Sequence, residues 1–136
     1  MLENIPLDIP SRAHLSFEAV AAAARTVTEN SDDIKNLGFR GVTLYLDITA
    51  ASGTTPTLDI KLQTKDPVSD GYVDMPGAAF AQKTGAGSDT LTVYPGVGET
   101  ANRSVSDVLP EDWRIVSTIG GTTPSFTYSI GAVYLR

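Results

Sequence analysis

The side chains that could do chemistry in this chain are few, and their spacing matches no known reaction centre. The 136 residues contain one histidine, His14, and no cysteine. Without cysteine there can be no disulfide, no thiolate-bound metal and no cysteine nucleophile. A Ser-His-Asp triad would have to use His14, and the chain has no G-x-S-x-G turn that would present a serine. We therefore interpret His14 as a surface residue and predict that the protein is not an enzyme.

Three aspartates recur in the stretch KDPVSDGYVD, at Asp66, Asp70 and Asp74. Paired acids can hydrolyse glycosides, and closely spaced acids can bind calcium. The spacing does not fit the EF-hand loop, and Asx turns around Pro67 and Gly71 explain these aspartates equally well. A loop-built calcium site stays as the alternative. The stretch PGVGETAN lacks the third glycine of a nucleotide-binding loop, so we expect no cofactor.

Charge and hydropathy exclude several classes of partner. The formal net charge is -6, and an acidic surface is repelled by phosphate backbones, which argues against nucleic acid as a partner. No window approaches the ~18 apolar residues that a membrane span needs. The start MLENIPLDIPSR has no basic region followed by an apolar run, so it does not resemble a signal peptide. We expect a soluble protein that is made in the cytoplasm and has no membrane partner.

The tetrapeptide GTTP occurs twice, at residues 53–56 and 121–124, and each copy lies between two alternating segments. Apolar and polar residues alternate in GVTLYLDIT and TLDIKLQT, and again in DWRIVSTIG and SFTYSIGAVYL, as in strands with one buried face. Glycine supplies a positive φ, and proline stops strand pairing. The pattern therefore predicts two antiparallel hairpins, each closed by a Gly-Thr-Thr-Pro loop. Tyr45 falls on the polar face of its strand and is expected to point outward.

Shorter strands are expected between these hairpins. GYVDMPG and AAFAQKT are separated by the turn signal Pro76-Gly77, and SDTLTVYPG forms another strand with Leu91 and Val93 facing inward. Segment 16–25 is compatible with a short helix capped by Ser16 or with a strand, whereas the β-branched residues in 25–29 favour a strand. About seven or eight strands with regular turns predict an all-β, antiparallel β-sandwich of the jelly-roll or immunoglobulin-like type.

The N-terminal segment differs from the rest of the chain. Residues 1–17 carry apolar side chains around Pro6 and Pro10, which hold the chain extended, so we expect an arm that must lie against something. It can pad its own sandwich domain, residues 18–136, or cross to a neighbouring subunit. The long irregular stretch 96–112 is a second expected contact. The residues expected to touch another subunit or a capsid are Leu2, Ile5, Pro6, Leu7, Ile9, Leu15, Phe17, Val97, Val105, Val108 and Leu109.

Roughly the last two thirds of the chain resembles a family of small virion proteins of tailed bacteriophages. The stretches that carry the resemblance are GVTLYLDITAASGTTPTLDIKLQTKDP, YVDMPGAAFAQ, DTLTVYPGVGETAN and VSDVLPEDWRIVSTIGGTTPSFTYSIGA. Within that group the chain looks most like a capsid decoration, or cement, protein on the outer surface of the head. The resemblance implies a homotrimer that binds the major capsid protein and stabilises the capsid by clamping neighbouring subunits.

Two other functions remain open at this point. A tail, connector or fibre component of the same virion could share the sandwich. A carbohydrate-binding or adhesin module is the alternative from a different class, with exposed tyrosines as its platform. A glycan binder should show an open aromatic face, whereas a cement protein should bury its arm between chains.

Overall fold

A computed structural model describes residues 15–136, which form an all-β protein with no helix among them. It therefore offers no helix that could span a membrane within that range. The sandwich-like all-β prediction is confirmed. The strands are β1 (Ser16–Arg25), β2 (Glu29–Asn30), β3 (Ile34–Lys35), β4 (Gly41–Lys65), β5 (Tyr72–Ala79), β6 (Gly87–Val93), β7 (Ser104–Val105) and β8 (Asp112–Leu135).

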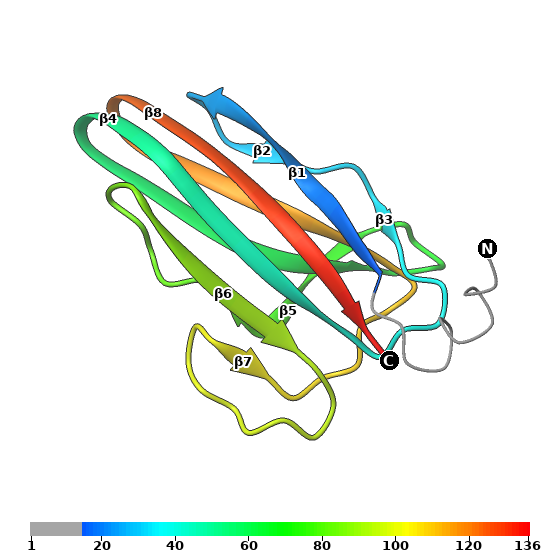
Figure 1. Ribbon diagram of the computed structural model, residues 1–136. Helices are drawn as coiled ribbons and strands as arrows, with labels where there is room; N and C mark the ends of the chain where they lie inside the picture. The colour runs from blue at the N-terminus through cyan, green and yellow to red at the C-terminus, as the bar shows by residue number, and fades with distance from the viewer. Residues whose placement is uncertain (1–14) are drawn as a thin grey trace, which may run out of the picture.

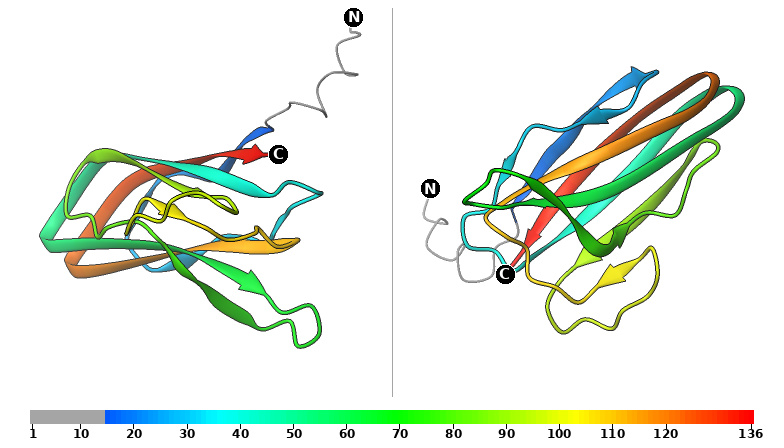
Figure 2. Two further views of the ribbon diagram at one scale, coloured as in Figure 1. Left: turned by 90° about the horizontal axis from the view of Figure 1, so that it is seen from below. Right: turned by 180° about the vertical axis from the view of Figure 1, so that it is seen from behind.

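Two very long strands, β4 and β8, form an antiparallel ribbon that folds over on itself (Figure 1). One half of the ribbon carries β1 beside β8 and β6 beside β4, and β7 extends this layer parallel to β6. The other half carries β2 and β3 beside β8 and β5 beside β4. Seen from below, the two halves stack as the layers of a sandwich (Figure 2). One continuous sheet therefore supplies both layers.

The core lies between these layers and follows the alternation in the sequence. In each half of β4 and of β8, every second residue points inward, as expected from the pleat of a strand. Trp113 donates from Nε1 to the hydroxyl of Tyr134 over 3.2 Å, and that hydroxyl donates to the carbonyl of Lys35 over 2.7 Å. The side chains that were expected inward and are buried are Val42, Leu44, Leu46, Ile48, Leu58, Ile60, Leu62, Leu91, Val93, Trp113, Ile115, Phe126, Tyr128 and Ile130.

The GTTP segments do not close hairpins, which corrects the sequence prediction. The halves of β4 do not pair with each other; each pairs with a half of β8, and Thr54 lies opposite Thr122. The two tetrapeptides thus lie side by side at the corner where the ribbon passes from one layer to the other (Figure 1). Register shifts on both sides of Thr54 supply the bend, because a bulge bends the strand that contains it.

The corner also explains why each tetrapeptide begins with glycine. Gly53 and Gly121 have φ values of 112° and 113°. A Cβ on Gly53 would lie 2.6 Å from the carbonyl oxygen of Thr123, and one on Gly121 would lie 2.7 Å from that of Thr55. Each glycine therefore admits the backbone of the other copy, and the repeat reflects an approximate two-fold symmetry of the corner.

Three further segments refine the sequence reading. The ambiguous segment 16–25 is strand β1. Residues 26–28, which were expected to continue as strand, instead form the connection to β2, where Val27 is 63% exposed. Pro76 and Gly77 lie within β5 at a shift of its register against β4, so the expected turn is a bulge in one strand.

Candidate functional site

The described residues place only part of the expected contact set. Leu2, Ile5, Pro6, Leu7 and Ile9 lie outside the described residues, as does His14. Leu15 is 54% exposed immediately before β1. Phe17 already belongs to β1 and packs at 5.0 Å, between ring centroids, on Tyr134. Phe17 therefore supports the protein's own core at the point where the N-terminal segment begins.

The stretch 96–112 contributes to the core as well as to the surface. Val105 and Leu109 are only 5% and 3% exposed, so these two expected contacts face inward. The reason is backbone pairing: β7 pairs with β6, and the N–H of Leu109 donates to the carbonyl of Arg40 over 2.9 Å. Val97 is half-buried, whereas Val108 is 58% exposed. Val108 is thus the residue of this stretch that is most available to a partner.

Exposed apolar side chains gather at one end of the sandwich, opposite the GTTP corner. Of the seven large exposed hydrophobic residues among residues 15–136, five lie in or beside the connections at this end. Figure 1 shows these connections at the end of the sandwich that lies away from the GTTP corner. We call this surface the apolar end; its residues are Leu15, Leu37, Val68, Val73 and Val108.

A groove of about 470 Å³ opens within the apolar end. It lies between the β4–β5 turn and residues 107–110, and Val73 and Val108 line it with Met75 and Pro67. Val73 shares the inward parity of the buried Met75 but is 59% exposed. The β4–β5 hairpin projects beyond the body of the sandwich, as Figure 2 shows, which accounts for this exposure. The alternation in the sequence could not predict the groove, because it depends on how far each layer extends.

The outer face of the second layer is covered by ion pairs. Lys61 binds Asp74 at 3.0 Å, and Lys65 binds Asp33 at 2.7 Å. The Tyr72 hydroxyl also donates to Asp33, so the hydrogen bonds from Lys65 and Tyr72 lower the pKa of Asp33. These groups neutralise one another at the surface and do not leave an acid or a base poised for catalysis. No local pattern predicts this network, because its members come from three separate segments.

The same network covers a candidate aromatic platform. The guanidinium carbon of Arg114 lies 3.4 Å from the centroid of the Tyr72 ring. Tyr45 is 50% exposed on the other layer, which confirms its outward position, and it lines a shallow pocket with Asp47 and Arg103. Of the tyrosines within residues 15–136, Tyr45 is the exposed one. A glycan platform built from exposed tyrosines would therefore rest on this single ring.

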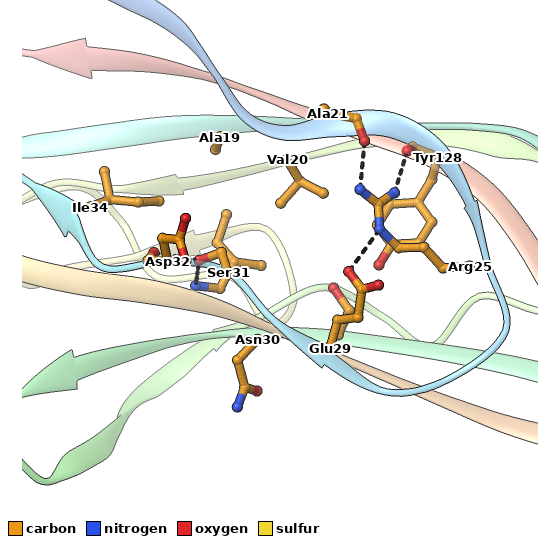
Figure 3. A pocket seen from close by; sticks show the side chains of 12 residues that line it. Ala19, Val20, Ala21, Arg25, Glu29, Asn30, Ser31, Asp32, Ile34 and Tyr128 are labelled. Atoms are coloured by element: carbon orange, nitrogen blue, oxygen red, sulfur yellow. Dashed lines mark hydrogen bonds and ion pairs between the residues drawn. The ribbon is translucent and has the colours of Figure 1, made fainter.

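A polar pocket of about 290 Å³ lies at the edge between β1 and β2 (Figure 3). Arg25 occupies its wall and donates to three carbonyl oxygens, those of Ala21, Ala23 and Tyr128, at 2.6–3.1 Å. Its Nε donates to Glu29 over 3.0 Å. The register of β1 against β8 shifts between Val20 and Ala23, and the carbonyls of Ala21 and Ala23 lie at this shift. Arg25 therefore completes the hydrogen bonding of an irregular edge strand.

The hydroxyl of Tyr128 in this pocket is buried and lies near Ser117 without reaching hydrogen-bond geometry to any atom of residues 15–136. Burial raises the pKa of this phenol. A water molecule is the simplest partner, because the pocket is polar and large enough to hold one. The pocket thus has a structural explanation and presents no set of convergent free groups.

The acidic side chains of the described residues do not form a metal-binding cluster. No three His, Cys, Asp or Glu side chains within residues 15–136 lie together as metal ligands would. Asp66 accepts hydrogen bonds from the N–H groups of Val68 and Ser69, as an Asx turn does. These bonds, that of Val68 first, lower the pKa of Asp66. The aspartates of this segment therefore shape a turn.

Comparison with known proteins identifies no relative. No family model matches the chain, and no curated protein matches it significantly.

Proposed function

We propose that this chain is a non-enzymatic structural protein of a tailed-bacteriophage virion that decorates and stabilises the capsid exterior. In this proposal it binds the major capsid protein and copies of itself, as a homotrimer, and needs no cofactor. It is made in the host cytoplasm and functions on the outer surface of the head. The resemblance of four stretches to small phage virion proteins supports this role.

The apolar end is the observation that carries the proposal. Large apolar patches on soluble proteins usually mark surfaces that bind other proteins. Here Leu15, Val73 and Val108 are each more than half exposed, at the same end of the sandwich as the junction of the apolar N-terminal segment with β1. An arm and an apolar surface at the same end suit a protein that clamps several subunits, because each added contact then becomes effectively intramolecular.

The arm gives a first test of this function. Removing residues 1–12 should leave the sandwich folded, because the core lies entirely within the later strands. We expect the full-length protein to have about three times the 14.4 kDa mass of one chain. The truncated protein should have the mass of one chain by light scattering, with unchanged circular dichroism. Trimers of the truncated protein would show that residues 1–12 do not hold the copies together.

A further inference from the structure

We propose that the groove at Val73 and Val108 binds residues 5–9 of a neighbouring copy of this chain. The inference deepens the proposed function and rests on its claim that copies associate through the arm. It assigns a particular acceptor to a particular part of that arm. The acceptor is formed by the β4–β5 hairpin and by residues 107–110.

The sequence of the arm fits an apolar groove along one side. In IPLDI, Ile5, Leu7 and Ile9 are separated by one residue each. In an extended chain, alternate side chains point to the same face, so these three form one apolar row. Val73 and Val108 are exposed in the groove, and the buried Met75 forms its floor. Asp8 would point to the opposite face, away from the apolar lining of the groove.

The prolines limit how the arm can pair. Successive residues of an extended strand direct their peptide groups to opposite edges. Residues 5, 7 and 9 therefore share one edge with intact N–H groups, whereas Pro6 and Pro10 lie on the other edge and have none. Such a segment can attach by one edge and cannot recruit a further strand by the other. The arm can therefore pair with a strand by one edge and offers no second edge for further pairing.

The geometry favours a neighbouring copy as the donor. The arm joins β1, which lies beside β8, whereas the groove lies at β5, on the β4 side of the ribbon. Three strand spacings of about 4.8 Å and one layer spacing of about 10 Å separate these two edges, or about 17 Å straight through the protein. The six steps from Ile9 to Leu15 reach only about 20 Å. Reaching the groove of its own chain would therefore need an almost fully extended linker along a straight path, whereas the arm of a neighbouring copy has no such constraint.

This arrangement also has a consequence for symmetry. Donor and acceptor lie at different surfaces of the chain, so the contact is head-to-tail. Head-to-tail contacts close into rings when the rotation allows it, and a ring of three satisfies every arm and every groove. The groove assignment therefore accounts for a trimer without any self-complementary patch.

Disulfide trapping tests the contact directly, because the chain has no cysteine of its own. Full-length Leu7→Cys protein is mixed with full-length Val108→Cys protein under mild oxidation. We expect a covalent dimer at a yield about tenfold or more above that with Val27→Cys, a control valine of similar exposure at the other end of the sandwich. Equal yields with the two partners would overturn the assignment, as would no dimer with either.

Two further measurements separate the alternatives. A chain that carries both Leu7→Cys and Val108→Cys should give covalent multimers; closure within single chains alone would overturn donation by a neighbour. Val108→Asp should reduce the mass to that of one chain, whereas Val27→Asp should not, with circular dichroism confirming that both fold. A Val108→Asp protein that keeps the wild-type mass would contradict the proposal.

The groove assignment and the decoration function can fail separately. Trapping at Val108 in a protein that ignores phage heads would leave the groove contact standing and remove the decoration function. Binding to heads without trapping at Val108 would remove the groove contact and leave the function standing.

Discussion

At the scale of single residues, Arg25 has the most demanding structural role. Its guanidinium donates to three carbonyl oxygens, two at the register shift of β1 and one in β8. The same group lies 4.7 Å from the centroid of the Tyr128 ring. Few side chains can replace it, because the planar fork reaches several acceptors at once. The irregular edge of the first layer therefore depends on this one arginine.

Replacing Arg25 by methionine should destabilise the protein by about 1–2 kcal/mol, because a part-buried hydrogen bond to the Tyr128 carbonyl and two exposed ones are lost. Arg25→Lys should recover only part of this loss, since an ammonium group cannot reach all three oxygens. Urea unfolding measures both variants. The control is Arg103→Met, an exposed arginine with no side-chain hydrogen bond to residues 15–136, and its effect should stay within about 0.5 kcal/mol. Equal losses of unfolding free energy in Arg25→Met and Arg103→Met would contradict the structural role of the Arg25 guanidinium.

The lowered pKa of Asp33 predicts that the stability of the protein depends on pH. Hydrogen bonds from Lys65 and Tyr72 lower its folded pKa below the ordinary value of 3.8. The unfolded chain then binds a proton more readily, so the stabilisation is present above pH 3.8 and is lost as pH falls through the lowered value. Asp33→Asn should therefore be less stable than the wild type at pH 7, and the difference should shrink at acid pH.

Thermal unfolding between pH 7 and pH 2 measures this difference. Asp32→Asn is the matched control, because Asp32 forms no ion pair within residues 15–136. A gap between Asp33→Asn and the wild type that stayed constant with pH would show that the ion pair does not act through the protonation of Asp33.

At the scale of elements, the GTTP corner determines how one sheet becomes two layers. Gly53→Ala or Gly121→Ala places a methyl group against backbone atoms of the opposite tetrapeptide and strains a positive φ. Each substitution should cost about 1–3 kcal/mol. Gly85→Ala is the control, since nothing lies within 4 Å of its added Cβ. Chemical denaturation distinguishes them, and corner variants as stable as Gly85→Ala would contradict the close contact between the two tetrapeptides.

The elements also show what could be predicted from the sequence. Alternation identified the buried faces from Val42 to Ile48 and from Phe126 to Ile130, because the pleat is a local property. The pairing of Thr54 with Thr122 is a contact between distant segments, and a local pattern cannot distinguish it from a hairpin turn. The inward positions of Val105 and Leu109 were missed for the same reason, since they depend on pairing with β6 and on a bond to Arg40.

At the scale of the whole molecule, the two ends of the sandwich differ. The corner end is closed by glycine, threonine and proline backbones in tight contact. The opposite end exposes apolar side chains and a groove between the β4–β5 turn and residues 107–110. This polarity suits a protein that presents one end to partners and the other to solvent, and the proposed arm contact uses the apolar end.

The central claim is that this protein binds the exterior of phage heads, and co-sedimentation tests it most directly. Full-length protein is mixed with expanded heads that were assembled without it and is then centrifuged. We expect the protein to pellet with these heads in a saturable amount, and protein without residues 1–12 to stay in the supernatant. Full-length protein that stays in the supernatant at all concentrations would contradict binding to the exterior of the head.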